Sequence, residues 1–309
     1  MSNKMKGVLF GIIASVAYGT NPLFSLPLYD EGMNPDSVLF YRFAFASLLL
    51  GVLLISKGES LKITKKEVFP LFVFGVIFSL SSLFLFQSFL YMDAGIASTI
   101  LFIYPVLVAV IMTLFFKEKA SFLTFGCIAL SLVGIALLYK GDGQTALSNK
   151  GLILVAFSAL VYSLYIIGVG HSSLRTMSIG KMTFWVIFFG MFVFIVRTKL
   201  LIELQFIPSY RAGLNLLGVA IIPTVISILF INIAVKYIGS TSTAIIGALE
   251  PVTALLIGVL VFQEQITARI ILGVLLILIA VTLVVAGKPL MNDIHKRIAH
   301  RNQRFRRLV

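Results

Sequence analysis

The chain alternates between long apolar runs and short polar segments, and this pattern predicts a series of helices. Seven runs carry no charged residue: 7–29, 68–92, 94–116, 120–139, 151–170, 212–235 and 270–287. Most of them reach the roughly 20 residues that an α-helix needs to cross a bilayer. Three further segments are similar but are shortened or interrupted by a charge: 37–56, 182–196 and 240–262. The pattern therefore predicts ten membrane-spanning helices.

Composition agrees with a membrane protein. Hydrophobic residues make up 59% of the chain and charged residues 12%, with a mean hydropathy of +1.06. A soluble domain of this length needs far more polar surface. Only helices and closed barrels satisfy the backbone inside a bilayer, and the runs lack the alternating pattern of outer-membrane strands. The predicted fold class is an all-α polytopic membrane protein.

The two halves of the chain repeat each other. Residues 104–118 read YPVLVAVIMTLFFKE and residues 250–264 read EPVTALLIGVLVFQE, so that Pro105 aligns with Pro251. Tyr18 likewise corresponds to Tyr162. Five helices per half make the second half enter the membrane from the opposite side, so we expect two inverted five-helix repeats with a site between them. The expected parts are a first repeat at 1–140, a linker at 141–150, a second repeat at 151–287 and a basic tail at 288–309.

The net charge of +13 follows the predicted topology. With the N-terminus inside, 18 Lys and Arg residues fall on the cytoplasmic side and 6 on the outer side, as the positive-inside rule requires. We therefore expect a bacterial inner-membrane protein with both termini in the cytoplasm. The basic tail is expected to hold anionic lipids, at ~1 kcal/mol per basic residue. Nucleic-acid binding is not expected, since Phe305 alone offers no stacking surface.

The paired segments that run from Pro-Val to Glu, together with the opening GIIASVAYGTNPLF, resemble the drug/metabolite transporter superfamily. The closest branch is the EamA-type carriers, which have two EamA repeats. The resemblance implies a central cavity lined mainly by helices 1–4 and 6–9, with helices 5 and 10 as scaffold. It also implies alternating access and a small-molecule substrate. The substrate, the direction of transport and the coupling ion stay open.

Glu250 is the first candidate for a functional residue, because it is the acid deepest within a predicted helix. A charge there costs roughly 2.5–3.5 kcal/mol on insertion scales. Pro251 follows it and removes a backbone donor, which favours a kink, and Pro105 does the same in the first half. We expect Glu250 to couple protons or to meet a substrate amine. The alternative is a structural bond that holds the halves together.

Arg42 is the second charge inside a span, about five residues from the outer end of its helix. It could bind a substrate carboxylate or phosphate, pair with Glu250, or extend to the lipid headgroups. Uncharged candidates for substrate binding share a position inside the spans: Tyr18, Asn21, Gln87, Tyr104, Tyr162, Tyr165, Trp185 and Asn232. For each of these the alternative is a packing role between helices, or for Trp185 an anchor at the membrane interface.

The sequence offers little enzymatic chemistry. Paired carboxylates, metal-ligand spacings, a nucleophile elbow and a phosphate-binding loop are all absent from it, so no enzyme, cofactor or metal is expected. The favoured function is a secondary carrier that exports or exchanges a small organic metabolite, such as an amino acid. The alternatives are a passive channel or facilitator and a lipid-handling protein, and a homodimer stays open. Glu118 and Glu264, at the helix ends, are expected to cap or pair with neighbouring loops.

Overall fold

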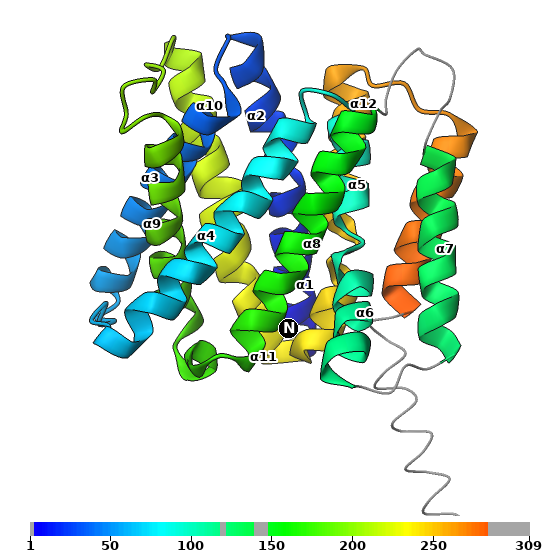
Figure 1. Ribbon diagram of the computed structural model, residues 1–309, viewed down its shortest axis with the longest axis horizontal. Coiled ribbons are helices and arrows are strands. Elements are labelled where there is room, and N and C mark those ends of the chain that lie inside the picture. Colours follow the sequence, from blue (N-terminus) through cyan, green and yellow to red (C-terminus); the bar gives the residue numbers. More distant parts are fainter. Residues whose placement is uncertain (1–2, 118–121, 139–147, 284–309) are drawn as a thin grey trace, which may run out of the picture.

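The computed structural model describes residues 3–117, 122–138 and 148–283 of the chain. Within these residues every regular element is helical (Figure 1). The helices are α1 Asn3–Gly19, α2 Asn21–Asp30, α3 Pro35–Ser56, α4 Lys65–Ser88, α5 Ala94–Leu101, α6 Tyr104–Phe116, α7 Phe122–Leu138, α8 Asn149–His171, η1 Ser173–Thr176, α9 Ile179–Arg197, α10 Tyr210–Ala220, η2 Ile221–Ile226, α11 Ser227–Ile246 and α12 Leu249–Phe262. A further apolar helix spans Ala268–Leu283.

These helices account for the ten predicted spans. Seven helical segments are long and apolar enough to cross a membrane, and three shorter apolar helices span Phe125–Leu138, Leu249–Phe262 and Ala268–Leu283. The turns 57–64 and 172–178 lie at the lower end of the molecule in Figure 1, and the turns 89–93 and 198–209 lie at its upper end. The prediction of an all-α polytopic membrane fold is confirmed.

Three of the spans are interrupted, each just before a proline. The first breaks at Thr20, ahead of Pro22 in the first turn of α2. The fourth breaks at 102–103, ahead of Pro105, and the ninth breaks at 247–248, ahead of Pro251. Proline lacks an N–H and its ring clashes with the preceding turn, so it is tolerated in the first turn of a new helix. Tight turns bridge the breaks, with hydrogen bonds from the Thr20, Ile103 and Glu250 N–H groups to carbonyls three residues earlier.

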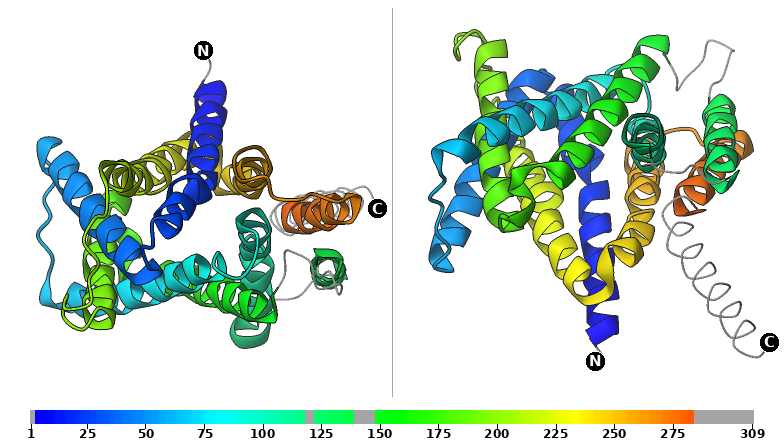
Figure 2. Two further views of the ribbon diagram at one scale, coloured as in Figure 1. Left: turned by 90° about the horizontal axis from the view of Figure 1, so that it is seen from above. Right: turned by 60° about the horizontal axis from the view of Figure 1, so that its bottom comes forward.

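The two halves pack against each other through several helix pairs. The first-half helices α1, α3 and α4 pack against α11, α9 and α8 of the second half. α4 also packs against α9, where a Cβ on Gly75 would lie 2.9 Å from the backbone N of Gly190. By contrast, α7 and the helix Ala268–Leu283 lie together at one side of the bundle in both views (Figure 2). The main body is therefore formed by intermixed helices of both halves.

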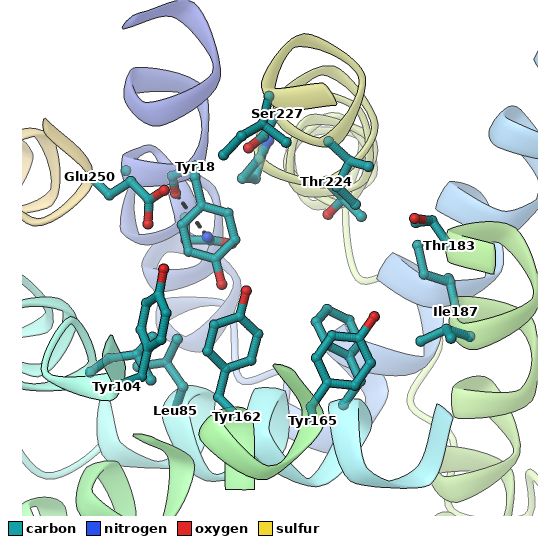
Figure 3. A pocket seen from close by; sticks show the side chains of 18 of the residues that line it. Tyr18, Leu85, Tyr104, Tyr162, Tyr165, Thr183, Ile187, Thr224, Ser227 and Glu250 are labelled. Atoms are coloured by element: carbon teal, nitrogen blue, oxygen red, sulfur yellow. Dashed lines mark hydrogen bonds between the residues drawn. The ribbon is translucent and has the colours of Figure 1, made fainter. Parts of the chain in front are cut away.

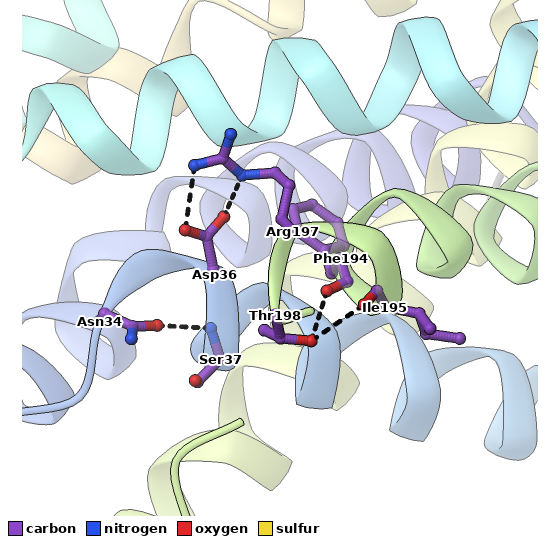
Figure 4. Close-up of polar contacts among 7 residues, drawn as sticks. All are labelled: Asn34, Asp36, Ser37, Phe194, Ile195, Arg197 and Thr198. Carbon is purple, nitrogen blue, oxygen red and sulfur yellow. Dashed lines mark hydrogen bonds and ion pairs between the residues drawn. The ribbon is translucent and has the colours of Figure 1, made fainter. Parts of the chain in front are cut away.

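At the upper end, the first turn of α3 is tied to the last residue of α9 (Figure 4), and the turn before α3 to the segment that follows α9. Arg197 forms an ion pair with Asp36, and its Nη2 donates to Asp36 Oδ2 at 3.0 Å. The Gln205 side chain accepts from the Asn34 N–H and donates to the Gly32 carbonyl at 3.0 Å. These contacts close the upper end between the first and second halves.

Candidate functional site

A cavity of about 260 Å³ lies in the middle of the bundle, between the two halves (Figure 3). Its lining comes from α1 to α6, α8, α9, η2, α11 and α12, whereas the described residues of α7 and Ala268–Leu283 contribute none. Eight of the ten predicted substrate-binding residues line it: Tyr18, Asn21, Arg42, Tyr104, Tyr162, Tyr165, Asn232 and Glu250. The arrangement matches the central cavity that the resemblance implied.

Tyrosine rings form one wall of the cavity. The rings of Tyr104 and Tyr162 meet edge to face with centroids 4.8 Å apart, and Tyr165 stacks on Tyr162 at 6.0 Å. Figure 3 shows the hydroxyls of Tyr104 and Tyr162 directed into the cavity toward Tyr18. The Ser163 hydroxyl donates to the Tyr104 carbonyl at 3.1 Å, which fixes α8 against the start of α6. This wall presents apolar ring surface together with hydrogen-bonding hydroxyls.

Glu250 lies opposite that wall, in the first turn of α12 and beside Tyr18 (Figure 3). Within the described residues its carboxyl group makes no hydrogen bond or ion pair, and it faces the cavity. Its N–H donates to the Gly247 carbonyl at 2.9 Å, across the break that precedes Pro251. A Cβ on Gly19 would lie 2.6 Å from the Glu250 carbonyl, so the glycine allows α1 to approach this break closely.

Arg42 supplies the second charge of the cavity. Its side chain is buried, with the residue 4% exposed, so it does not extend to the membrane surface. Nε donates to the Thr224 hydroxyl at 3.0 Å, and the guanidinium carbon lies 5.1 Å from the centre of the Phe86 ring. No ion pair joins Arg42 to Glu250 in the described part of the chain. The cavity therefore holds a cation and an acid that do not neutralise each other directly.

Thr224 was not among the predicted residues, although it holds Arg42 in place. It lies in η2, a π-helical turn at Ile221–Ile226 that also contains Pro223. Its hydroxyl donates to the Val219 carbonyl at 2.9 Å, so the oxygen remains free to accept from Arg42. π-Turns inside α-helices are frequent at functional sites. A signal was present in the sequence, since Pro223 interrupts the apolar run 212–235.

The other predicted residues divide into two groups. Asn21 lines the cavity, donating from Nδ2 to the Tyr18 carbonyl at 2.8 Å, and its Oδ1 is buried with no hydrogen-bond partner. Gln87 and Trp185 are not among the lining residues. The Trp185 indole instead donates to the Leu61 carbonyl at 2.9 Å, which attaches the turn 57–64 to α9.

The cavity extends toward the lower end of the molecule. Its lining includes Ile179 and Met182 from the first turn of α9, next to the lower turn 172–178. No residue of the upper segments 31–34 and 198–209 lines it. The central residues are therefore separated from the upper end by the contacts around Arg197 and Gln205.

Comparison with known proteins shows the family to which the chain belongs. The model of the EamA-like transporter family matches residues 5–140 and 149–286, one match in each half. The chain belongs to this family. Its members are polytopic membrane transporters, which agrees with the fold and with a cavity between two repeats. The protein is therefore a membrane transporter of the EamA-like family.

Three of the relatives that match the chain are named only as uncharacterized transporters. The chain is 24% identical to the uncharacterized transporter YdfC of Bacillus subtilis, over 79% of each chain. It is 25% identical to an uncharacterized transporter of Archaeoglobus fulgidus, over 82% of this chain and 89% of the other. The match to YxxF of Bacillus subtilis, at 28% identity, covers only 54% of that protein. A solved crystal structure shares the fold, with a TM-score of 0.64 at 16% identity, over 90% of this chain and 97% of the other.

Proposed function

We propose that this EamA-like transporter is a secondary carrier that exports or exchanges a small organic metabolite, an amino acid or a related molecule, by alternating access. The observation that carries the proposal is the central cavity with its two opposite charges on different helices. Arg42 and Glu250 both line the cavity, and neither has an ionic partner among the described residues. Charges inside a membrane protein are costly to keep, and they commonly mark a substrate or ion pathway.

A zwitterionic substrate fits these two charges. The Arg42 guanidinium donates to Thr224 through Nε only, so its Nη groups are available to a carboxylate. Glu250 accepts from the ammonium group of the same molecule. The rings of Tyr104, Tyr162 and Tyr165 then surround an apolar or aromatic side chain. The cavity volume of about 260 Å³ suits a molecule of that size better than a nucleotide.

An asymmetry between the two ends supports alternating access. The cavity lining extends to the first turn of α9, near the lower end, whereas the Asp36–Arg197 pair and the Gln205 contacts tie the two halves together at the upper end. We propose that the lower end faces the cytoplasm, as the positive-inside rule predicts. In the opposite state the upper contacts break, the lower ends of α3 and α9 approach other helices, and the substrate leaves outward.

Glu250 is the proposed proton-coupling residue, because it is the acid of the cavity and makes no bond that would fix its protonation state. The test is transport into proteoliposomes with and without a pH gradient. Glu250→Gln should abolish gradient-driven accumulation and retain exchange, since it keeps the shape and removes the titratable proton. Unchanged pH dependence in Glu250→Gln would contradict the coupling role, and Glu203→Gln, an exposed residue at the upper end, is the control.

The same vesicles separate a carrier from a channel. A carrier exposes its site to one side at a time, so external labelled substrate should accumulate transiently against unlabelled internal substrate. A channel gives no such counterflow, and its flux does not saturate. Movement of a fluorescent lipid with no flux of any soluble compound would instead favour a lipid-handling protein.

A further inference from the structure

Glu264 occupies a niche between two glycines, away from the central cavity. It follows α12 by two residues, and its N–H donates to the Gly258 carbonyl at 2.9 Å. Its side chain therefore folds back over the end of α12. A Cβ on Gly258 would overlap the Glu264 carboxyl group, and a Cβ on Gly95 of α5 would lie 3.1 Å from Oε2. The absence of side chains at both positions makes room for the carboxyl group between the two helices.

This carboxyl group joins the two halves at the upper end. Its Oε1 accepts from the N–H of Ala94, the first residue of α5, at 2.9 Å. Asp93 occupies the usual capping position of α5 but makes no capping bond through its side chain. An acid from the second half thus caps a helix of the first half, which confirms the expectation that Glu264 caps a neighbouring segment. Its Oε2 is buried and has no hydrogen-bond partner among the residues that the structure describes.

The surroundings of Glu264 favour its neutral form. Burial and the nearby charge of Asp93 raise the pKa of Glu264 from 4.5 to about 7, against the opposing effect of the N–H groups of Ala94 and Gly95. Burial also raises the pKa of Asp93. Among the described residues, Asp93 is the charged side chain that acts on the pKa of Glu264. Lys150 of α8 instead donates to the Tyr91 hydroxyl at 2.7 Å.

We propose that Glu264 is a pH-sensitive latch between the two halves at the upper end of the transporter. When protonated, the carboxyl group stays in the glycine niche and holds the end of α12 against α5. When it loses the proton, the charged group leaves the niche for water and the two helices separate there. Since α5 continues to Ser98 and Leu101 in the cavity lining, its release loosens the cavity wall on the α5 side, whereas the contacts of Arg197 and Gln205 hold the α3–α9 side. The latch is distinct from Glu250 and goes beyond the proposed transport function.

The direction of the pH effect follows from the two pKa values. In the niche the Glu264 pKa is about 7, and an exposed glutamate has the ordinary value of 4.5. Because the latched state binds the proton more tightly, the latch is fully closed below pH 4.5 and is lost as the pH rises through 7. Between these values the ratio of latched to unlatched molecules falls about tenfold for each pH unit.

The experiment measures the distance across the latch directly. Spin labels are attached to Leu90→Cys and Gln265→Cys, two exposed positions on either side of it, in the full chain with Cys127→Ala. Pulsed electron resonance in vesicles gives the distance distribution from pH 4.5 to pH 8. We expect one short distance at low pH and a second, longer distance that grows until about pH 7. No substrate is needed, so this result is separate from the test of transport.

Two variants and a control decide the outcome. Glu264→Gln cannot ionise, so it should keep the short distance at every pH. Asp93→Asn removes the neighbouring charge, so it should lower the pKa of Glu264 and shrink the pH response. Glu203→Gln, an exposed acid at the same end, should respond like the parent chain. A parent distance that does not change with pH, or an equal response in Glu264→Gln, overturns the latch. If Glu264→Gln does not fold, an unchanged response in Asp93→Asn overturns it.

Discussion

At the scale of single residues, the cavity depends on how its buried cation is held. Arg42 donates one hydrogen bond to the Thr224 hydroxyl, and its guanidinium lies over the ring of Phe86. A cation over an aromatic ring gains ~0.5–2 kcal/mol, and more where it is desolvated. These contacts orient the guanidinium of Arg42, which lines the cavity. Thr224 is therefore a positioning residue for the proposed anion-binding group.

Replacing Thr224 should show this role. Thr224→Val keeps the shape and removes the oxygen that accepts from Arg42, so it should lower the free energy of unfolding by about 0.6–1.7 kcal/mol, the range found for polar contacts in membrane proteins. The matched control is Thr253→Val, since the Thr253 hydroxyl bonds only to Leu249 of its own helix. Thermal unfolding in detergent compares the two. Equal losses in both variants would show that the Arg42 contact contributes nothing.

Cavity residues at positions related by the internal repeat were predictable from the sequence, whereas several others were not. Tyr18 and Tyr162 occupy equivalent places, and Glu250 is the repeat equivalent of Tyr104, so all four were expected near the centre and all four line the cavity. Thr224 was not predicted, because its position depends on a π-turn, which changes the direction of side chains without changing hydropathy. Gln87 and Trp185 were predicted to line the cavity but do not. Whether they do depends on the rotation of their helices, which the apolar residues around them do not specify.

At the scale of elements, close helix contacts hold the two halves together. α4 and α9 come from different halves, and they approach closely at Gly75, where a Cβ would lie 2.9 Å from the Gly190 N and from the Val186 carbonyl. In a bilayer, small residues allow such approach, because helix association there relies on packing rather than on the hydrophobic effect. The apolar runs predicted these helices, but not which faces of them meet.

Two glycine-to-alanine variants test this packing. Gly75→Ala places a methyl group against fixed backbone atoms and should destabilise the protein by about 1–3 kcal/mol. Gly126→Ala meets nothing within 4 Å on α7, so it should be neutral or stabilising by up to ~1 kcal/mol. Chemical or thermal unfolding in detergent gives both values. A Gly75→Ala protein as stable as Gly126→Ala would contradict the close α4–α9 contact.

At the scale of the whole molecule, the distribution of charge predicts the orientation. The sequence-based count of 18 Lys and Arg residues inside and 6 outside predicts that the turn 57–64 is internal and the segment 198–209 external. In a Cys127→Ala background, Glu203→Cys should react with an impermeant maleimide on intact cells, and Glu59→Cys only after permeabilisation. The reverse labelling would invert the molecule and the direction assigned to its cavity.

The most direct test of the account is ligand binding by the purified transporter. Thermal stability is measured against amino acids, amines, nucleotides, sugar phosphates and cationic drugs. A ligand at a hundred times its Kd should add roughly 2.7 kcal/mol. We expect molecules that carry both a carboxylate and an amine to stabilise the parent protein and Glu203→Gln, but neither Arg42→Gln nor Glu250→Gln. Stabilisation by such molecules that persists in both cavity variants, or that no such molecule produces, would contradict a substrate site between Arg42 and Glu250.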